Sequence, residues 1–269
     1  MASGLAILAI GFLLGIRHAT DPDHVIAVST IVSRERSLLK AGLIGILWGV
    51  GHTLTITAVG AAIILFGLAI PTRVGLTMEF CVGMMLILLG VLNLTGVTQW
   101  MSRRFSPVHP PTTGEHAHIH AHAGKMHLHR HTHAPGGQHH GESVAPPRWI
   151  RRIFGGMGLY QALRPLFVGI VHGLAGSAAI ALLVLSTIQQ PRWGVLYLLI
   201  FGLGTIAGMM FITAAIALPF SFAGYRFGWL NRGLVAGSGL ISLAFGLFVC
   251  YRIGFVDGLF TSTPHWKPN

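Results

Sequence analysis

Five ionisable side chains occur within eight residues of one apolar segment near the amino terminus. The stretch reads Arg17-His18-Ala19-Thr20-Asp21-Pro22-Asp23-His24. A lone ionisable group at membrane depth costs about 2.5–3.5 kcal/mol, so these groups must pair, face water or bind a cation. Imidazole nitrogens and carboxylate oxygens together suit Ni²⁺, Co²⁺ and Zn²⁺. We therefore predict a metal site formed by His18, Asp21, Asp23 and His24. The alternative is a buried ion pair of Arg17 with one aspartate that only shapes the helix.

The same stretch should interrupt its helix. Pro22 has no N–H to donate to the carbonyl of His18, and it disfavours the helical conformation of Asp21. A second helix can begin with Asp21 as the N-cap and Pro22 at the first helical position.

Two further histidines lie in later apolar segments. His52, within Gly51-His52-Thr53, is predicted to add a third imidazole, or else to bond a backbone carbonyl of a neighbouring helix. For His172 three roles stay open: a metal ligand, a gate across the pathway, or a packed histidine with its hydrogen bonds satisfied. Asn93 and Gln161 are expected to bond between helices.

The composition shows which elements must position these side chains. Hydrophobic residues make up 52% of the 269 residues and charged residues only 9%, against about 25% charged in soluble domains. So few charges cannot cover a water-facing surface, which excludes a soluble enzyme. Six continuous apolar runs each reach the length of a membrane-spanning helix, and they predict an all-α polytopic membrane protein. The runs are Leu5–Val32, Leu38–Ala69, Met78–Thr98, Leu163–Ile188, Trp193–Phe220 and Leu230–Ile253.

The second half of the chain repeats the first. Gly15-Ile16-Arg17-His18-Ala19 aligns with Gly169-Ile170-Val171-His172-Gly173, and shorter matches pair Trp48–Gly51 with Phe201–Gly204 and Val82-Gly83 with Ala236-Gly237. Three helices per half is an odd number, so the second copy should be inverted, an architecture frequent among secondary transporters.

We predict halves at residues 1–101 and 153–269, with His18 and His172 approaching each other near the bilayer midplane. Broken helices are expected at Asp21-Pro22 and at 173–177, although the glycines of the second stretch equally allow close helix packing.

Residues 102–152 between the halves are polar, rich in proline and predicted to be disordered. Their alternating histidines form a candidate metal buffer, unless the segment is an insertion without function. The candidate ligands are His116, His118, His120, His122, His127, His129, His131 and His133.

The net charge of +11 comes from cations that cluster between apolar runs. This pattern is typical of topology signals and predicts a cytoplasmic histidine-rich loop with both termini outside a cell membrane. Nucleic-acid binding is excluded because no basic face with interleaved aromatics occurs. The predicted partners are the lipid bilayer and metal ions, and the oligomeric state stays open. We expect no prosthetic group and no enzymatic activity, because no nucleophile, base and orienting group cluster outside the metal motif.

The pattern His18-x4-Asp23-His24, with Asp21 between, resembles the H-x4-D-H signature of the nickel/cobalt transporter family. Gly51-His52-Thr53 is similar to that family's next helical motif, and the six spans with a histidine-rich loop resemble its shorter branch, the urease-accessory membrane proteins. The resemblance implies permeation of Ni²⁺ or Co²⁺, with His18, Asp21, Asp23 and His24 as the selectivity site and His52 assisting. The family's later acidic motifs are replaced here, at Ala175–Ala178 and at Thr213-Ala214.

The sequence leaves three candidate functions. The first is a secondary permease for Ni²⁺ or Co²⁺, with Zn²⁺ as a further candidate, that works by alternating access. The second is a membrane metal chaperone that hands nickel to urease or hydrogenase metallochaperones. The third, an exporter of small anions or amino acids, is disfavoured because the deep charges are mainly Asp and His.

Overall fold

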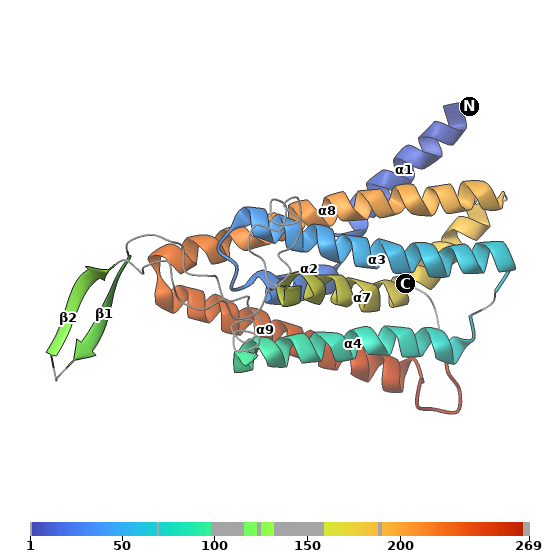
Figure 1. The fold of residues 1–269 in the computed structure, drawn as a ribbon. Helices are drawn as coiled ribbons and strands as arrows, with labels where there is room; N and C mark the ends of the chain where they lie inside the picture. The colour runs from blue at the N-terminus through green and yellow to red at the C-terminus, as the bar shows by residue number, and fades with distance from the viewer. Residues whose placement is uncertain are drawn as a thin grey trace, which may run out of the picture. The chain divides into compact units, whose positions relative to one another are not determined.

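The computed structural model describes residues 2–68, 70–97, 116–122, 125–131, 159–187 and 190–265. Side chains are described over the same residues, except at 2–4, 159–160, 176–187, 224–226 and in both strands. The chain forms two compact units: Met1–Phe105 together with Met157–Asn269, and Ser106–Gly156. The first unit is helical, which confirms the prediction of an all-α polytopic membrane protein (Figure 1). Its elements are α1 (Ala2–His18), α2 (Pro22–Val32), α3 (Leu38–Phe66), α4 (Thr72–Thr95), α7 (Leu159–Thr187), α8 (Pro191–Arg226), α9 (Gly228–Tyr251) and the π-helical turn η1 (Arg252–Val256).

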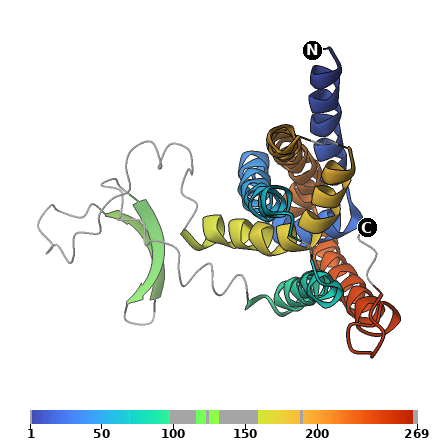
Figure 2. The ribbon, with the colours of Figure 1, turned by 90° about the vertical axis from the view of Figure 1, so that its right-hand side faces the viewer.

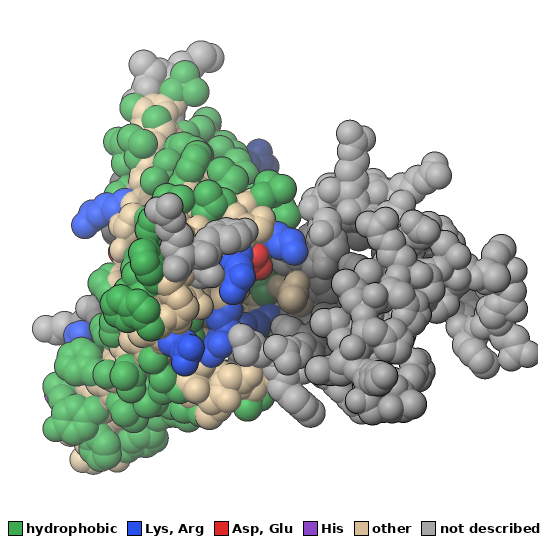
Figure 3. Space-filling view, turned by 90° about the vertical axis from the view of Figure 1, so that its left-hand side faces the viewer, with side chains coloured by type: hydrophobic (Ala, Val, Ile, Leu, Met, Phe, Trp, Pro, Cys, Tyr) green, Lys and Arg blue, Asp and Glu red, His purple; other side chains and the backbone are tan. Residues whose placement is uncertain are grey.

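Most of these helices match the predicted membrane spans. Within the described residues, α3, α4, most of α8, and α9 together with η1 are long and apolar enough to cross a bilayer. Leu5–His18 and Pro22–Val32 form a further candidate span that is bent by 55°. α7 occupies the remaining predicted segment and packs against α3. Hydrophobic side chains cover much of the helical surface in the space-filling view, as contact with lipid requires (Figure 3).

The predicted break in the first apolar segment is confirmed. α1 ends at His18, Asp21 occupies the N-cap position of α2 with extended backbone angles, and Pro22 is the first helical residue. Asp21 makes no side-chain capping hydrogen bond. Its carboxylate instead contacts His18, so the break turns this side chain toward the candidate site.

The predicted interruption at 173–177 is wrong, because α7 is one continuous helix through this stretch. The described glycine there serves the other role that the sequence allowed, close helix packing. A Cβ on Gly173 would lie 2.6 Å from the carbonyl oxygen of His52, and a Cβ on Gly169 would overlap the carbonyl oxygen of Trp48. The glycines therefore bring α7 against the backbone of α3, which is how small residues act between membrane helices.

The contacts between the halves are reciprocal. A Cβ on Gly15 of α1 would overlap the carbonyl oxygen of Phe201 in α8, just as one on Gly169 of α7 would overlap that of Trp48 in α3. Gly15 and Gly169 are 154 positions apart, and the residues that they contact, Trp48 and Phe201, are 153 positions apart. The same exchange relates a second pair of contacts, Gly51 with Leu166 and Gly204 with Phe12. A two-fold axis produces such reciprocal pairs.

The third helices of the two halves obey the same symmetry with a different offset. A Cβ on Gly90 would lie 2.8 Å from the carbonyl oxygen of Gly239, and one on Gly246 would lie 2.8 Å from that of Gly83. These pairs are related by 156 positions, so Gly83 is equivalent to Gly239. The predicted match of Gly83 with Gly237 is wrong, because a Cβ on Gly237 would meet nothing within 4 Å.

Equivalent helices run in opposite directions. Figure 1 shows α3 antiparallel to α8, and α4 antiparallel to α9. α3 and α8 pack together at the centre, while α1 packs on α8 and α7 on α3. α4 and α9 pack as a pair on one side of the bundle, away from the outer end of α1 (Figure 2). The antiparallel, reciprocal arrangement is that of inverted repeats.

Asn93 joins three helices, as expected for a lone amide in a membrane helix. Its Nδ2 donates to the carbonyl oxygen of Val235 (3.2 Å) and to Oγ of Ser238 (3.0 Å) in α9. Its Oδ1 accepts from Oγ of Ser33 (3.2 Å), the residue that follows α2. The α4–α9 pair is thereby attached to the carboxyl end of α2.

The histidine-rich unit contains an antiparallel hairpin. Its strands are β1 (His116–His122) and β2 (Lys125–His131), with His118 opposite His129 and His120 opposite His127. These two stretches were predicted to be disordered with the rest of 102–152. The difference has a physical reason, because histidines that alternate with other residues have the two-residue period of a strand. His133 lies outside the described residues.

Candidate metal site

Four imidazole rings from four helices meet inside the bundle. His18 ends α1, His24 lies in the first turn of α2, His52 is in α3 and His172 is in α7. The ring of His24 is central, with centroids 4.7 Å from His18, 4.9 Å from His52 and 4.2 Å from His172. His24, His52 and His172 are at most 2% exposed. The predicted approach of the two repeat-related histidines is therefore present, and His172 faces the cluster.

His18 connects α1 with α3. Its Nε2 lies 3.1 Å from Nε2 of His52. Two nitrogens bound to one ion at about 2.0–2.1 Å are separated by about 3 Å, so this spacing suits joint coordination. Its Nδ1 lies 2.7 Å from Oδ2 of Asp21. A carboxylate in this position fixes the orientation of a metal-binding histidine.

Asp23 connects α2 with α7. Its Oδ2 lies 3.0 Å from Nε2 of His172. Its Oδ1 lies 3.2 Å from Nδ1 of His24 and accepts a hydrogen bond from the His24 backbone N–H at 3.0 Å. Asp21 and Asp23 thus both pair with histidines, whereas Arg17 is exposed. The ion pair with Arg17, which the sequence left open, is not formed.

Three ring nitrogens of the cluster are buried without a hydrogen-bond partner among the described residues. They are Nε2 of His24, Nδ1 of His52 and Nδ1 of His172. A buried polar atom without a partner costs about 1–3 kcal/mol. A neutral imidazole nitrogen is the commonest metal ligand, and each ring offers one such nitrogen to an ion. A cation beside His18 and His52 could therefore take Nε2 of His24, which has no other partner among the described residues.

The donor atoms form two overlapping groups, each compact enough for one ion. His18, His24 and His52 offer ligand atoms that lie within 4.8 Å of one another, and so do Asp23, His24 and His172. Asp21 belongs to neither group, and its carboxylate contacts Nδ1 of His18. Nitrogen ligands with one carboxylate fit Ni²⁺, Co²⁺ or Zn²⁺ better than Mg²⁺ or Ca²⁺.

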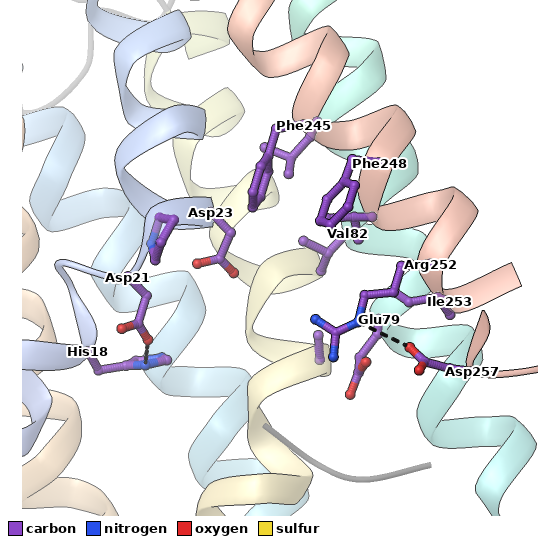
Figure 4. A pocket seen from close by; sticks show the side chains of 14 residues that line it. His18, Asp21, Asp23, Glu79, Val82, Phe245, Phe248, Arg252, Ile253 and Asp257 are labelled. Carbon is purple, nitrogen blue, oxygen red and sulfur yellow. Dashed lines mark hydrogen bonds and ion pairs between the residues drawn. The ribbon is translucent and has the colours of Figure 1, made fainter. Parts of the chain in front are cut away.

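A cavity of about 430 Å³ leads to one side of the cluster. Figure 4 shows His18, Asp21 and Asp23 on one wall, with Glu79 and Asp257 across from them. Four of the chain's seven acidic residues line this cavity. Such a concentration of carboxylates raises the local concentration of cations.

Glu79 and Asp257 were not among the predicted site residues. Glu79 is an acidic residue near the start of an apolar run, and this signal could have identified it. Asp257 follows the last apolar helix, and its Oδ2 lies 3.7 Å from Nε of Arg252. Only the fold shows that it lies opposite the first helix break.

The fold and the site define a polytopic membrane protein in which three buried histidines meet His18 and two aspartates that face a cavity. The sequence is 36% identical over 256 residues to the urease accessory protein UreH of Bacillus sp. (strain TB-90), and the match covers 95% of each chain. The chain belongs to the UreH family of urease accessory proteins, which confirms the resemblance found in its motifs. No family model and no solved structure matches the sequence.

Proposed function

We propose that this protein is a secondary permease that moves Ni²⁺ or Co²⁺ across the cell membrane. The observation that supports the proposal most is the meeting of four imidazole rings from both halves of the chain beside a cavity lined by carboxylates. His18, Asp23, His24, His52 and His172 would bind the ion, while Asp21 orients His18. Nickel is favoured over cobalt and zinc because the relative is named a urease accessory protein.

The inverted halves suggest how the ion moves. The cluster takes ligands from both halves, and the same glycine-mediated contacts recur on each side of the pseudo-two-fold axis. In transporters built from inverted repeats, the halves rock around a central site and expose it to the two sides in turn.

The proposed orientation follows from charge. Arg34, Arg36, Lys40 and Arg232 lie where α2 ends and where α3 and α9 begin. Lys and Arg side chains gather on this end of the helical unit in Figure 3. We assign this end and the histidine-rich segment to the cytoplasm, and both termini to the outside.

Flux of ⁶³Ni²⁺ into sealed vesicles that contain the purified protein tests the proposal. A permease gives time-dependent accumulation that is released by an ionophore and is absent from protein-free vesicles. The relative's name also favours a second function, a membrane accessory protein that passes nickel to urease-maturation partners. Such a protein binds nickel in the same vesicles but accumulates none inside.

Deletion of 115–140 should leave transport intact and change its dependence on metal concentration. These residues include all eight predicted loop ligands and belong to the unit outside the helical bundle. Alternating histidines buffer an ion without forming its path. The measurement is initial ⁶³Ni²⁺ uptake against concentration. Loss of uptake at unchanged protein abundance would make the segment part of the pathway.

A panel of divalent ions should separate transition metals from hard cations. For the purified protein lacking 115–140, we expect Ni²⁺ and Co²⁺ to raise the Tm, since a ligand at 100 times its Kd adds about 2.7 kcal/mol of stability. Mg²⁺ and Ca²⁺ prefer oxygen ligands and should leave the Tm unchanged. Equal shifts with Mg²⁺ and Ni²⁺ would contradict a nitrogen-based site.

A further inference from the structure

The ligand cluster is divided into two triads that share one residue. We call His18, His24 and His52 the first-half triad, and Asp23, His24 and His172 the bridging triad. The ligand atoms of each triad lie within 4.8 Å of one another. His24 belongs to both and is the ring closest to the other three.

The triads differ in which parts of the protein hold them. The first-half triad comes from α1, α2 and α3, all in the first half of the chain. The bridging triad combines Asp23 and His24 of α2 with His172 of α7, in the second half. The bridging triad therefore ties α2 to α7, whereas the first-half triad ties α2 to α1 and α3.

The triads also differ in charge. The first-half triad offers three imidazoles, while the bridging triad includes the carboxylate of Asp23. This carboxylate lies at the cavity and adds a negative charge beside His24 and His172, which are at most 2% exposed. Because a carboxylate attracts a divalent ion and an uncharged imidazole does not do so by charge, the two positions differ in affinity for the ion.

Building on the proposed function, we propose that the cluster provides two alternative positions for one transition-metal ion, and that the ion passes between them while His24 remains bound. An ion in the bridging triad ties α2 to α7. An ion in the first-half triad ties α2 to α1 and α3 instead. The position of the ion thereby determines whether α7 is among the helices that it holds.

Binding of Co²⁺ to the purified protein lacking 115–140 tests the two positions. Equilibrium dialysis gives affinity and stoichiometry, and the visible absorption of Co²⁺ reports its ligands. The variants are His52→Ala, His172→Ala, their combination, and His24→Ala. Ser242→Ala is the control, because it removes a buried hydrogen bond from α9 to the carbonyl oxygen of Leu86 and touches no ligand.

We expect one Co²⁺ per chain and an unequal response to the single substitutions. Alternative positions add their binding constants, so at least one of the single variants should lose no more than about twofold in affinity. The double variant lacks both complete triads and should bind far more weakly than either single variant. His24→Ala should match the double variant, with a loss of at least about 100-fold, since even outer-shell partners are worth about 10–100-fold.

Three other outcomes would overturn the inference. Strong losses in both single variants, with His24→Ala no worse, would indicate one site that uses all the ligands together. If the double variant binds Co²⁺ with the same affinity as the weaker-binding single variant, the ion uses only one triad, and the other substituted histidine is not a ligand. Failure of the unmodified protein to bind Co²⁺ would overturn the proposed function as well, whereas the first two results leave a permease with a single site.

Amide hydrogen exchange provides a second readout that does not depend on affinity. Saturating Co²⁺ should protect the amides of α7 around His172 in the unmodified protein and in His52→Ala. Protection should be absent from His172→Ala, in which the ion can occupy only the first-half triad. Equal protection of α7 in both variants would contradict binding of the ion in two distinct triads.

Discussion

His24→Ala should abolish nickel accumulation by cells that express the protein, with a fall of at least about 100-fold in the uptake rate. His24 is the one residue common to both groups of candidate ligands, and it is 1% exposed. Its removal leaves two ligands in each group, which is too few to compensate for the ion's lost hydration. The measurement is cellular ⁶³Ni²⁺ content normalised to the amount of protein in the membrane.

His265→Ala is the matched control, because this exposed histidine lies outside the cluster. The control should accumulate nickel at the unmodified rate. His24→Gln keeps a polar side chain in the cavity left by the imidazole, and it separates loss of coordination from loss of packing. Normal accumulation by both His24 variants would contradict the assignment of the cluster as the ion pathway.

Gly169→Ala should destabilise the protein and also impair metal binding. The added methyl group would overlap the carbonyl oxygen of Trp48 and would lie close to the backbone N of His52. Overpacking costs about 1–3 kcal/mol, and backbone atoms cannot turn aside as a side chain can. α7 must then move away from α3, which separates His172 from the other three rings. The measurements are the Tm in detergent and Co²⁺ affinity.

Gly237→Ala makes the same chemical change in another membrane helix and serves as the control. A Cβ at this position meets nothing within 4 Å. Alanine is the better helix former by about 1 kcal/mol, so the Tm should stay constant or rise. A Tm for Gly169→Ala equal to that of the control would contradict the close packing of α3 and α7.

Local chemistry made part of the site predictable. Proline lacks an N–H wherever it stands, so the break before Pro22 and the N-cap position of Asp21 followed from the sequence. Five ionisable groups in an apolar run had to find partners, and the repeat related His172 to His18. These arguments concern the backbone and the cost of burial, and they depend little on how helices pack.

Other features depend on tertiary packing and could not be predicted. The ion pair between Asp23 and His172 requires a particular rotation of α7 against α2. The stretch at 173–177 could equally unwind or pack closely, and only the approach of Gly173 to α3 decides between them. Gly83 could align with Gly237 or with Gly239 in a short glycine-containing match, and the reciprocal contacts select Gly239.

Ni²⁺ X-ray absorption spectroscopy on the purified protein lacking 115–140 tests the central claim most directly. We predict one bound ion per chain with nitrogen and oxygen ligands at about 2.1 Å and the outer-shell scattering of at least two imidazoles. The imidazole scattering should disappear in His24→Ala. Sulfur ligation, or no bound nickel once the histidine-rich segment is removed, would contradict a metal site at His18, Asp23, His24, His52 and His172.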